Sequence, residues 1–514
     1  MTAWRVRVAM LVLLVSSVLS ACTAGPSSRP DIVVNNAPGE ETTPTVAPNE
    51  VPPLENGDSN LLWRECTPEI RDALAAPTLP GWLPIQCSKV NGVLDSPYAP
   101  GRDVARLQLL KAGDGPVPIV VVNDVNGLPG TVYAARLAAS LPQTFFETFT
   151  LIGMDRRGTG NSAAANCVPP EVRRAMVEPD PAELDVTGWL EAAQTAGQQC
   201  SIALEAQLPA LDTWRTAADL DTLRTALGLG RLNAVGHGEG SRVVSMFADR
   251  FPDRVGRFVL DGLPDPSADA QIALEGVAKG AEAAWDAFAA ECVQRGCELG
   301  ADPEQTLLQL LGQLRTTPLT GFDLDITAGS TMHAILVGLS DRSAWPTLSA
   351  ALAKARAGDP SGLVAILTPS VLGSDAQAPT LDSTLVTSCN DTKTRLSPDQ
   401  ITTSAKDWQK QFPLFGPLVA ERLAFCGPWT VPNRPLPTPT GRGAPPILVL
   451  STASDATTPL EGTERAAQQL DSGVLVSWQG GGHGALGFSP CATTAAVNFL
   501  TDAAVPRNGT ACPP

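Results

Sequence analysis

The sequence predicts an α/β fold in which a mostly parallel β-sheet is flanked by helices and carries an inserted helical cap. Continuous apolar runs bounded by turn residues, such as 118–123, are typical of strands that are covered on both faces. These runs alternate with amphipathic segments of helical period, as in a sheet wrapped by helices. A glycine-rich turn, Gly236-His-Gly-Glu-Gly240, follows one apolar strand and opens a helix. Together the three observations favour a parallel sheet with a functional turn at one strand end.

The first part of the sheet domain begins near Leu62-Trp63 and extends to residue 264. Its apolar runs predict buried strands, and the intervening amphipathic stretches predict helices that pack on them. The predicted strands cover 104–110, 118–123, 149–155, 231–235 and 256–261, and the predicted helices cover 132–141, 216–227 and 242–250.

Between about Pro264 and Gly441 the alternation of strands stops and helical segments take over. We expect helices at 272–293, 303–314 and 346–357, and together they predict a cap inserted into the sheet domain. Strands resume at 446–451 and 474–478, before a final helix at 491–501. The predicted division is therefore a core at 61–264, a cap at 265–440 and a second part of the core at 441–514.

The first residues predict export. Arg5 and Arg7 precede an apolar run, 8–19, that is too short to span a bilayer. Residues 1–22 end in Leu-Ser-Ala-Cys22, which resembles the lipobox of bacterial lipoproteins. That resemblance implies cleavage before Cys22, its acylation with palmitate and other chains, and anchoring at the outer face of the bacterial cell membrane. An ordinary secretory signal with a chance cysteine is the alternative, and it also predicts export. Residues 23–60, rich in Pro, Asn, Ser and Thr, predict a flexible tether.

Cysteine usage fits an exported protein. Of eleven cysteines, setting Cys22 aside leaves ten, an even number suited to disulfides. The chain has no C-x-x-C motif and only three histidines, so we predict no metal site, and we predict no cofactor. Spacing alone leaves the connectivity open but favours Cys66–Cys87, Cys167–Cys200, Cys292–Cys297 and Cys491–Cys512, with Cys389 left for Cys426.

Composition restricts the partners. The hydrophobic content of 43% over 514 residues argues for a large core rather than a disordered chain. The 36 basic and 53 acidic side chains give a net charge of −17. This charge argues against nucleic acid as a partner, because polyanion binding requires an excess of basic groups.

The turn at 236–240 has the frame of a nucleophile elbow, G-x-S-x-G, with glycine at position 238 in place of the serine. His237 is interpreted as a residue that fills the variable second position. Asp455 follows one late strand and His483 follows the next, so nucleophile position, acid and histidine come in the order of an α/β-hydrolase. We expect Asp455 to fix the imidazole tautomer of His483 and to stabilise its imidazolium form.

A series of motifs runs in order along residues 61–514. They are Asp155-x-Arg-Gly-x-Gly-x-Ser162, 218–224, 251–262, Cys389-Asn-Asp391, Asp455-x-x-Thr-Pro459, Gly482-His-Gly484 and Pro490-Cys491. Through these motifs the chain resembles the exported tripeptidyl aminopeptidases and proline iminopeptidase-like hydrolases of bacteria. The resemblance implies an α/β-hydrolase core, a helical cap over the site, cleavage of short peptides from their N-termini, and catalytic roles for Asp455 and His483. Some relatives act on esters or amides.

Two departures from the family predict a weakened site. Gly238 has no atom that can attack a carbonyl, and Ser241 lies roughly 5 Å further along the helix axis. Glu239 is an unattractive nucleophile, since its role in the family is to offer a backbone N–H to the oxyanion. Where relatives have a Gly-Gly-Pro-Gly loop that supplies the other oxyanion donor, this chain has Asp124, Val125, Asn126 and Gly127. A carboxylate there opposes the negative charge that must develop in catalysis.

These features favour a pseudoenzyme with little or no serine-hydrolase activity that retains binding of a peptide or a small acyl or amide ligand. Two alternatives stay open. One is an active peptidase or esterase of the cell envelope that uses another nucleophile or a water activated by His483. The other is an interaction protein of the envelope in which the cap surface is the working part.

Overall fold

The computed structural model describes residues 50–514, apart from 75–77, 97–102, 322, 375–376 and 430–435. The predicted signal segment with its lipobox at Cys22, and residues 23–49 of the predicted tether, lie outside the described residues. Among the helices of the described part, none has the length and apolar character needed to cross a membrane.

A ten-stranded sheet forms the base of the domain, and its strands follow the order β1-β2-β3-β5-β4-β6-β7-β8-β9-β10. All neighbours from β5 to β10 are parallel, whereas β1, β2 and β3 pair in antiparallel fashion and attach to β5. The mostly parallel sheet predicted from the sequence is confirmed. The strands are β1 (Arg64–Glu65), β2 (Ile85–Val93), β3 (Val104–Ala112), β4 (Val117–Val122), β5 (Phe149–Met154), β6 (Leu232–His237), β7 (Val255–Asp261), β8 (Ile447–Ser454), β9 (Gly473–Gly481) and β10 (Thr510–Cys512).

Three of these strands were not predicted. β1 and β10 have two and three residues, too few to show a period. β2 contains Gln, Lys, Asn and Gly among its apolar residues, and its alternating burial reflects a position near the edge of the sheet. Pairing with β3 over nine residues stabilises it, and that pairing is not visible in the local sequence.

Helices cover both faces of the sheet because successive side chains of a strand point to opposite sides. Ile119 and Val121 of β4 pack with one group of helices, and Val120 and Val122 pack with another. The first group is α2 (Thr67–Leu74), α3 (Gly130–Ser140) and α18 (Pro490–Asp502); the second is α6 (Thr213–Ala226), α7 (Glu239–Arg250) and α17 (Leu460–Gln469). The α6 N-terminus is capped by the Asp212 side chain, which accepts from the Arg215 N–H.

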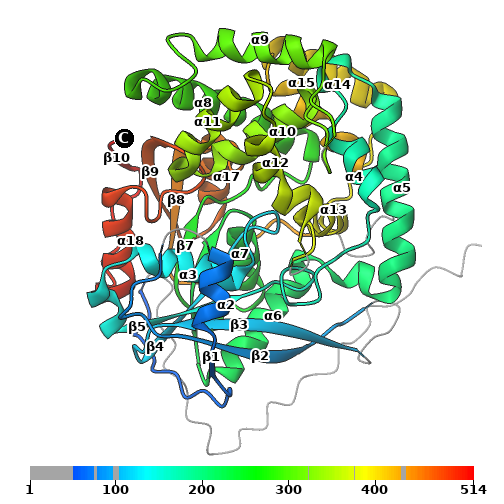
Figure 1. The fold of residues 1–514 in the computed structure, drawn as a ribbon. Helices are drawn as coiled ribbons and strands as arrows, with labels where there is room; N and C mark the ends of the chain where they lie inside the picture. The colour runs from blue at the N-terminus through cyan, green and yellow to red at the C-terminus, as the bar shows by residue number, and fades with distance from the viewer. Residues whose placement is uncertain (1–49, 75–77, 97–102, 322, 375–376, 430–435) are drawn as a thin grey trace, which may run out of the picture. The chain divides into compact units, whose positions relative to one another are not determined.

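Helices between β7 and β8 form the cap, which lies above the sheet in Figure 1. Its core is built on large buried side chains that include Trp285, Phe288, Trp345 and Phe415. The cap helices are α8 (Ala270–Arg295), α9 (Pro303–Thr316), α10 (Ala328–Ser340), α11 (Trp345–Arg356), α12 (Ser361–Leu367), α13 (Thr380–Asp391), α14 (Pro398–Gln411), α15 (Gly416–Ala420) and α16 (Arg422–Phe425).

The predicted boundary of the cap was incomplete, because a second segment between β5 and β6 also belongs to it. Val172 and Met176 of α4 (Pro170–Val177) and Ala196 of α5 (Val186–Leu204) pack into the same hydrophobic cluster as Trp285. In Figure 1 both helices run beside the cap helices rather than against the sheet. The local pattern of an amphipathic helix shows that one face is buried but not which neighbour buries it.

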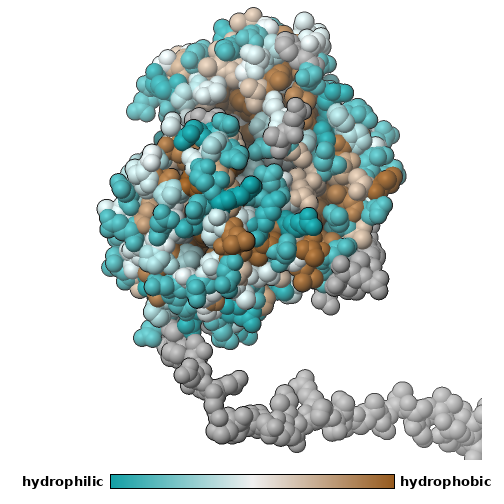
Figure 2. All heavy atoms as spheres, turned by 60° about the horizontal axis from the view of Figure 1, so that its bottom comes forward, coloured by the Kyte–Doolittle hydropathy of each residue, from teal (hydrophilic) through white to brown (hydrophobic). Residues whose placement is uncertain are grey.

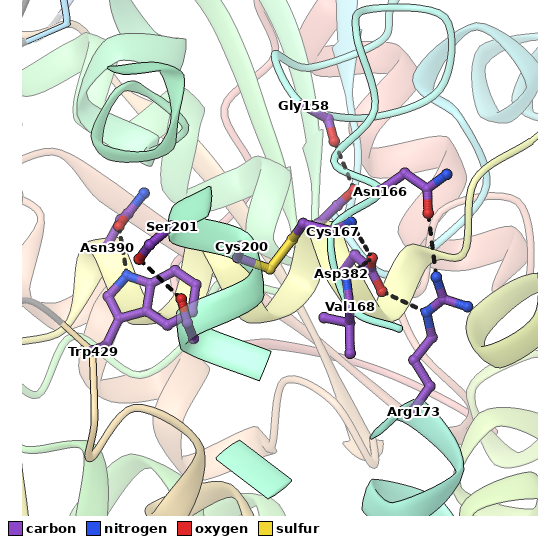
Figure 3. Close-up of a disulfide and its surroundings, with 12 residues drawn as sticks. Gly158, Asn166, Cys167, Val168, Arg173, Cys200, Ser201, Asp382, Asn390 and Trp429 are labelled. Carbon is purple, nitrogen blue, oxygen red and sulfur yellow. Dashed lines mark hydrogen bonds and ion pairs between the residues drawn. A yellow bond between two sulfur atoms is a disulfide. The ribbon is translucent and has the colours of Figure 1, made fainter. Parts of the chain in front are cut away.

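Asp382 of α13 joins the two segments of the cap (Figure 3). One carboxylate oxygen accepts from the backbone N–H groups of Cys167 at 2.7 Å and Val168 at 2.8 Å, and the other accepts from Arg173 Nε at 2.9 Å. The disulfide between Cys167 and Cys200 ties the same segment to α5. A fully buried carboxylate with three donors is thus the polar centre of the cap.

All five predicted disulfides are present, although spacing alone had left their connectivity open. They are Cys66–Cys87, Cys167–Cys200, Cys292–Cys297, Cys389–Cys426 and Cys491–Cys512.

The predicted tether is wrong for residues 50–60. Glu55 accepts from the backbone N–H groups of Gly230 at 2.7 Å and Arg231 at 3.1 Å, and the Pro52 carbonyl accepts from Arg257 Nε. A composition rich in Pro and Asn indicated a free chain, but these hydrogen bonds and the packing of Val51 and Leu54 on the core hold the segment to the domain.

The surface seen in Figure 2 is mainly hydrophilic, with hydrophobic side chains in small groups rather than one continuous area. Leu62, Val93 and Val104 are among the exposed apolar residues. Scattered apolar side chains of this kind are ordinary on a protein surface.

We predict that Asp382→Ala lowers the free energy of unfolding by about 3–5 kcal/mol, because it leaves the buried Arg173 without its ion pair. Urea unfolding of the oxidised protein measures this. Asp407→Ala is the control: Asp407 is exposed, 3.5 Å from Lys410, and its loss should cost no more than about 1 kcal/mol. Equal losses in the two variants would contradict the role assigned to Asp382.

Candidate active site

The turn between β6 and α7 keeps the backbone of a nucleophile elbow. Gly238 has φ +54° and ψ −124°, a conformation that side-chain-bearing residues rarely adopt. Gly240 packs so closely on the end of β4 that a Cβ there would lie 2.7 Å from the backbone nitrogen of Asn123. The strained turn therefore persists although position 238 carries no nucleophile.

Asp455 and His483 lie together at the carboxyl end of the sheet, as the sequence predicts. His483 Nδ1 is 2.9 Å from Asp455 Oδ2. Asp455 also accepts from the backbone N–H groups of Thr457 at 2.7 Å and Thr458 at 2.8 Å, and from the Thr458 hydroxyl. Both side chains are buried. These bonds hold the carboxylate rigidly and orient the imidazole of His483.

Asp124 occupies the space that a side chain at position 238 would need. A Cβ built on Gly238 would lie only 2.5 Å from Asp124 Cγ. The two carboxylate oxygens have different partners: Oδ1 accepts from the backbone N–H of Glu239 at 2.6 Å, and Oδ2 lies 2.8 Å from His483 Nε2. The carboxylate thus takes both the oxyanion donor and the hydrogen bond that a serine would make. A water activated by His483 would first have to displace Asp124.

The electrostatics of this contact hold His483 in its charged form. Burial alone would raise the pKa of Asp124, but the His483 charge and hydrogen bonds outweigh it and lower the pKa to about 2. Burial alone would lower the pKa of His483, but Asp455 and Asp124 together raise that pKa well above its ordinary value. His483 is therefore an imidazolium between two carboxylates at neutral pH, and an imidazolium cannot accept a proton as a general base.

His237 and Asp261 belong to the same buried network, and the sequence interpretation missed them. His237 Nδ1 lies 3.2 Å from Asp261 Oδ2, and its Nε2 lies 3.7 Å from Asp124 Oδ2. The His237 ring stacks on Tyr133, with ring centroids 4.9 Å apart. A signal was available, because His237 and Asp261 end adjacent parallel strands and face each other in register.

The remaining predicted residues take different places. Val125, Asn126 and the Glu239 side chain line a cavity beside the network, whereas Gly127 does not. Glu239 lies 3.6 Å from Arg242. The Ser241 hydroxyl is buried at the start of α7 without a hydrogen-bond partner among the described residues.

The cavity has a volume of about 680 Å³ and is lined by residues of both the sheet domain and the cap. This volume is typical of sites for small ligands. Asp391 of α13 is one of its acidic groups and accepts from the backbone N–H of Thr213 at 2.9 Å. Burial and the nearby charge of Asp212 raise the pKa of Asp391 to about 7. Other charged lining residues are Glu239, Arg242, Asp265, Lys393 and Arg422.

Comparisons with known proteins agree with this geometry. A family model described as TAP-like protein matches residues 411–512. The chain is 26% identical over 401 residues to a tripeptidyl aminopeptidase of Streptomyces coelicolor, covering 72% of this chain and 70% of that protein. It is 32% identical over 218 residues to serine protease Hip1 of Mycobacterium tuberculosis, covering 40% of this chain and 42% of that protein.

A longer match, 24% identical over 482 residues, is to carboxylesterase B of Mycobacterium tuberculosis and covers 88% of this chain and 90% of that protein. Among solved structures, an esterase of Thermogutta terrifontis aligns over 81% of this chain and 99% of its own, with a TM-score of 0.36 and 16% identity. With the sheet, the elbow and the Asp455–His483 pair in place, the chain has the fold of an α/β-hydrolase, and its residues 411–512 match the TAP-like family.

Proposed function

We propose that this protein is an exported, lipid-anchored member of the family that binds a peptide or a small acyl or amide ligand in its cavity with little or no serine-hydrolase turnover. The observation that carries the proposal is the Asp124 carboxylate in the space of the missing nucleophile side chain. A ligand carbonyl that reached this point would meet a fixed negative charge.

Each of the three parts of serine-hydrolase chemistry is altered here. Gly238 offers no nucleophile, and the loss of a catalytic serine costs about 10⁶ in turnover in a well-studied protease. The Glu239 N–H is engaged by Asp124, and losing one oxyanion donor costs about 10²–10³. His483 carries a proton on each nitrogen, which removes the general base. These losses fall on one site and support binding rather than catalysis.

The cavity supports a short peptide with a free amino terminus as the ligand. The chain is similar to a tripeptidyl aminopeptidase, and we extend the preference for a free amino terminus to this chain as part of the proposal. Asp391 is suited to bind an ammonium group, because it lines the cavity, its hydrogen bonds come from Thr213, and its partial burial strengthens a charge–charge contact.

The alternative of an active envelope peptidase or esterase has one observation in its favour. Asp124 is a carboxylate held beside a histidine and an oxyanion donor, and carboxylates act as nucleophiles in some hydrolases. Against it, the low pKa of Asp124 makes the carboxylate a weak nucleophile, and its two oxygens are both hydrogen-bonded.

We predict that a fluorophosphonate probe does not label the natural protein, and that Gly238→Ser alone restores almost no ester hydrolysis, since the new side chain meets Asp124. Gly238→Ser with Asp124→Gly should be labelled at position 238 and should hydrolyse p-nitrophenyl acetate at least about 10²-fold faster than Gly238→Ser alone. Asp124→Gly alone is the matched control and should stay inactive. A covalent adduct mapped to Asp124 or to a cavity serine of the natural protein would support the alternative instead.

We predict that tripeptides with a free α-amino group bind more tightly than their N-acetylated forms, and that Asp391→Asn weakens binding of the free form by about tenfold or more. Affinity should rise between pH 6 and 7.5, because Asp391 becomes charged as the pH passes its pKa of about 7, and should fall once the α-amino group loses its proton near pH 8. Calorimetric titration measures both effects. If acetylated and free peptides bound equally, the proposed contact would be wrong.

Export and lipid anchoring give a separate prediction, and the five disulfides support an oxidising compartment. In the native bacterium the protein should fractionate with the membrane, and mass spectrometry should find acyl chains on Cys22. Cys22→Ala should release the protein from the membrane fraction. A natural protein with an unmodified Cys22 would contradict the anchor.

A further inference from the structure

Two histidines and one aspartate converge at the centre of the buried network. His483 Nε2 lies 2.8 Å from Asp124 Oδ2, and His237 Nε2 lies 3.7 Å from the same oxygen. One ligand atom from each of the three side chains lies within 4.8 Å of the other two. The sequence predicted no metal site, because the cysteine and histidine spacing contains no metal motif. The three side chains come from the ends of three separate strands, which spacing rules do not detect.

Each histidine is held by its own buried carboxylate on the opposite side of the ring. His483 Nδ1 lies 2.9 Å from Asp455, and His237 Nδ1 lies 3.2 Å from Asp261. Histidine ligands of metal ions almost always donate their second N–H to such a partner, which fixes the tautomer and directs the other nitrogen at the metal. A hydrolase dyad accounts for the Asp455–His483 pair but leaves the second pair unexplained.

The two supporting carboxylates are themselves fixed. Asp261 accepts from the backbone N–H of Ala485 at 2.7 Å, and Asp455 accepts from Thr457 and Thr458. The Asp261 and Asp455 side chains are buried. Both imidazole rings therefore have little freedom to turn away from Asp124, and a preorganised donor set lowers the cost of capturing an ion.

We propose that Asp124, His237 and His483 bind a divalent cation of the zinc type. Two imidazole nitrogens and one carboxylate oxygen form a donor set that suits Zn²⁺, whereas Mg²⁺ and Ca²⁺ prefer oxygen ligands alone. Tetrahedral bonds of about 2.0–2.1 Å place neighbouring donor atoms about 3.4 Å apart, which lies between the two distances measured to Asp124 Oδ2. The cation replaces the proton on His483 Nε2, which passes to the solvent, and it partly neutralises three buried carboxylates.

Three protein ligands leave one coordination position for a water molecule or a polar group of a ligand. Val125, Asn126 and Glu239, which neighbour Asp124 and the elbow in sequence, line the cavity, so the three ligands lie next to its wall. This proposal does not rest on the proposed peptide binding, because a cation can bind in the absence of any peptide.

The test uses the full chain without a histidine tag, purified in detergent, treated with a chelator and dialysed. We expect one equivalent of Zn²⁺ by calorimetry, and one equivalent of Co²⁺ with visible absorption bands of a four-coordinate site. His237→Asn and Asp124→Asn should each weaken binding by more than about 100-fold. Asp261→Asn should weaken it by about 10–100-fold, the usual effect of losing an outer partner.

His333→Asn is the matched control and should leave the affinity unchanged, because His333 lies on α10 in the cap, 3.4 Å from Glu421. Circular dichroism of the metal-free variants checks that each is folded, and if His237→Asn does not fold, Asp124→Asn decides the result. The proposal is overturned if the natural protein binds no equivalent of Zn²⁺ or Co²⁺ below about 100 μM. It is also overturned if the folded His237→Asn or Asp124→Asn variant binds as tightly as His333→Asn.

Discussion

The contact on which the centre of this protein depends is the Asp124 carboxylate placed between the His483 imidazole and the Glu239 backbone N–H. It explains why glycine is required at position 238, since any side chain there would collide with the carboxylate. It also explains why His483 keeps its proton, because two carboxylates flank the ring. A single loop residue thereby links the elbow, through the Glu239 N–H, to the buried His483–Asp455 pair.

The sheet brings this network together. Asp124 follows β4, His237 ends β6, Asp261 ends β7, and Asp455 and His483 belong to the loops at the ends of β8 and β9. These strands are neighbours in the parallel sheet, so their carboxyl ends meet along one edge. The cap then adds the far wall of the cavity, and its two segments are joined through Asp382. The chemistry that such a scaffold performs is set by the residues at these strand ends rather than by the sheet itself.

The carboxylates carry different roles according to their partners. Asp455 and Asp261 accept backbone N–H groups and one imidazole each, which makes them fixed supports. Asp124 lies between two imidazole Nε2 atoms, so its carboxylate connects the two histidines. Asp391, in contrast, faces the cavity, and its pKa near 7 follows from burial beside Asp212. The peptide-binding and cation-binding proposals therefore concern separate groups of one connected site.

The sequence by itself determined the parallel sheet, the elbow and the Asp455–His483 pair, because these depend on local periodicity, turn chemistry and the order of motifs. It favoured the five disulfide pairs without fixing their connectivity, which the structure then decided. Only the tertiary structure decided three further matters: that α4 and α5 belong to the cap, that residues 50–60 are bound to the domain, and that Asp124 fills the space at Gly238. The His237–Asp261 pair is an intermediate case. The sequence places both residues at the ends of predicted strands, but only the structure shows that these strands are neighbours in register. The physical reason is that the second group depends on which surfaces meet in space, and a residue's neighbours along the chain do not determine its neighbours across the fold.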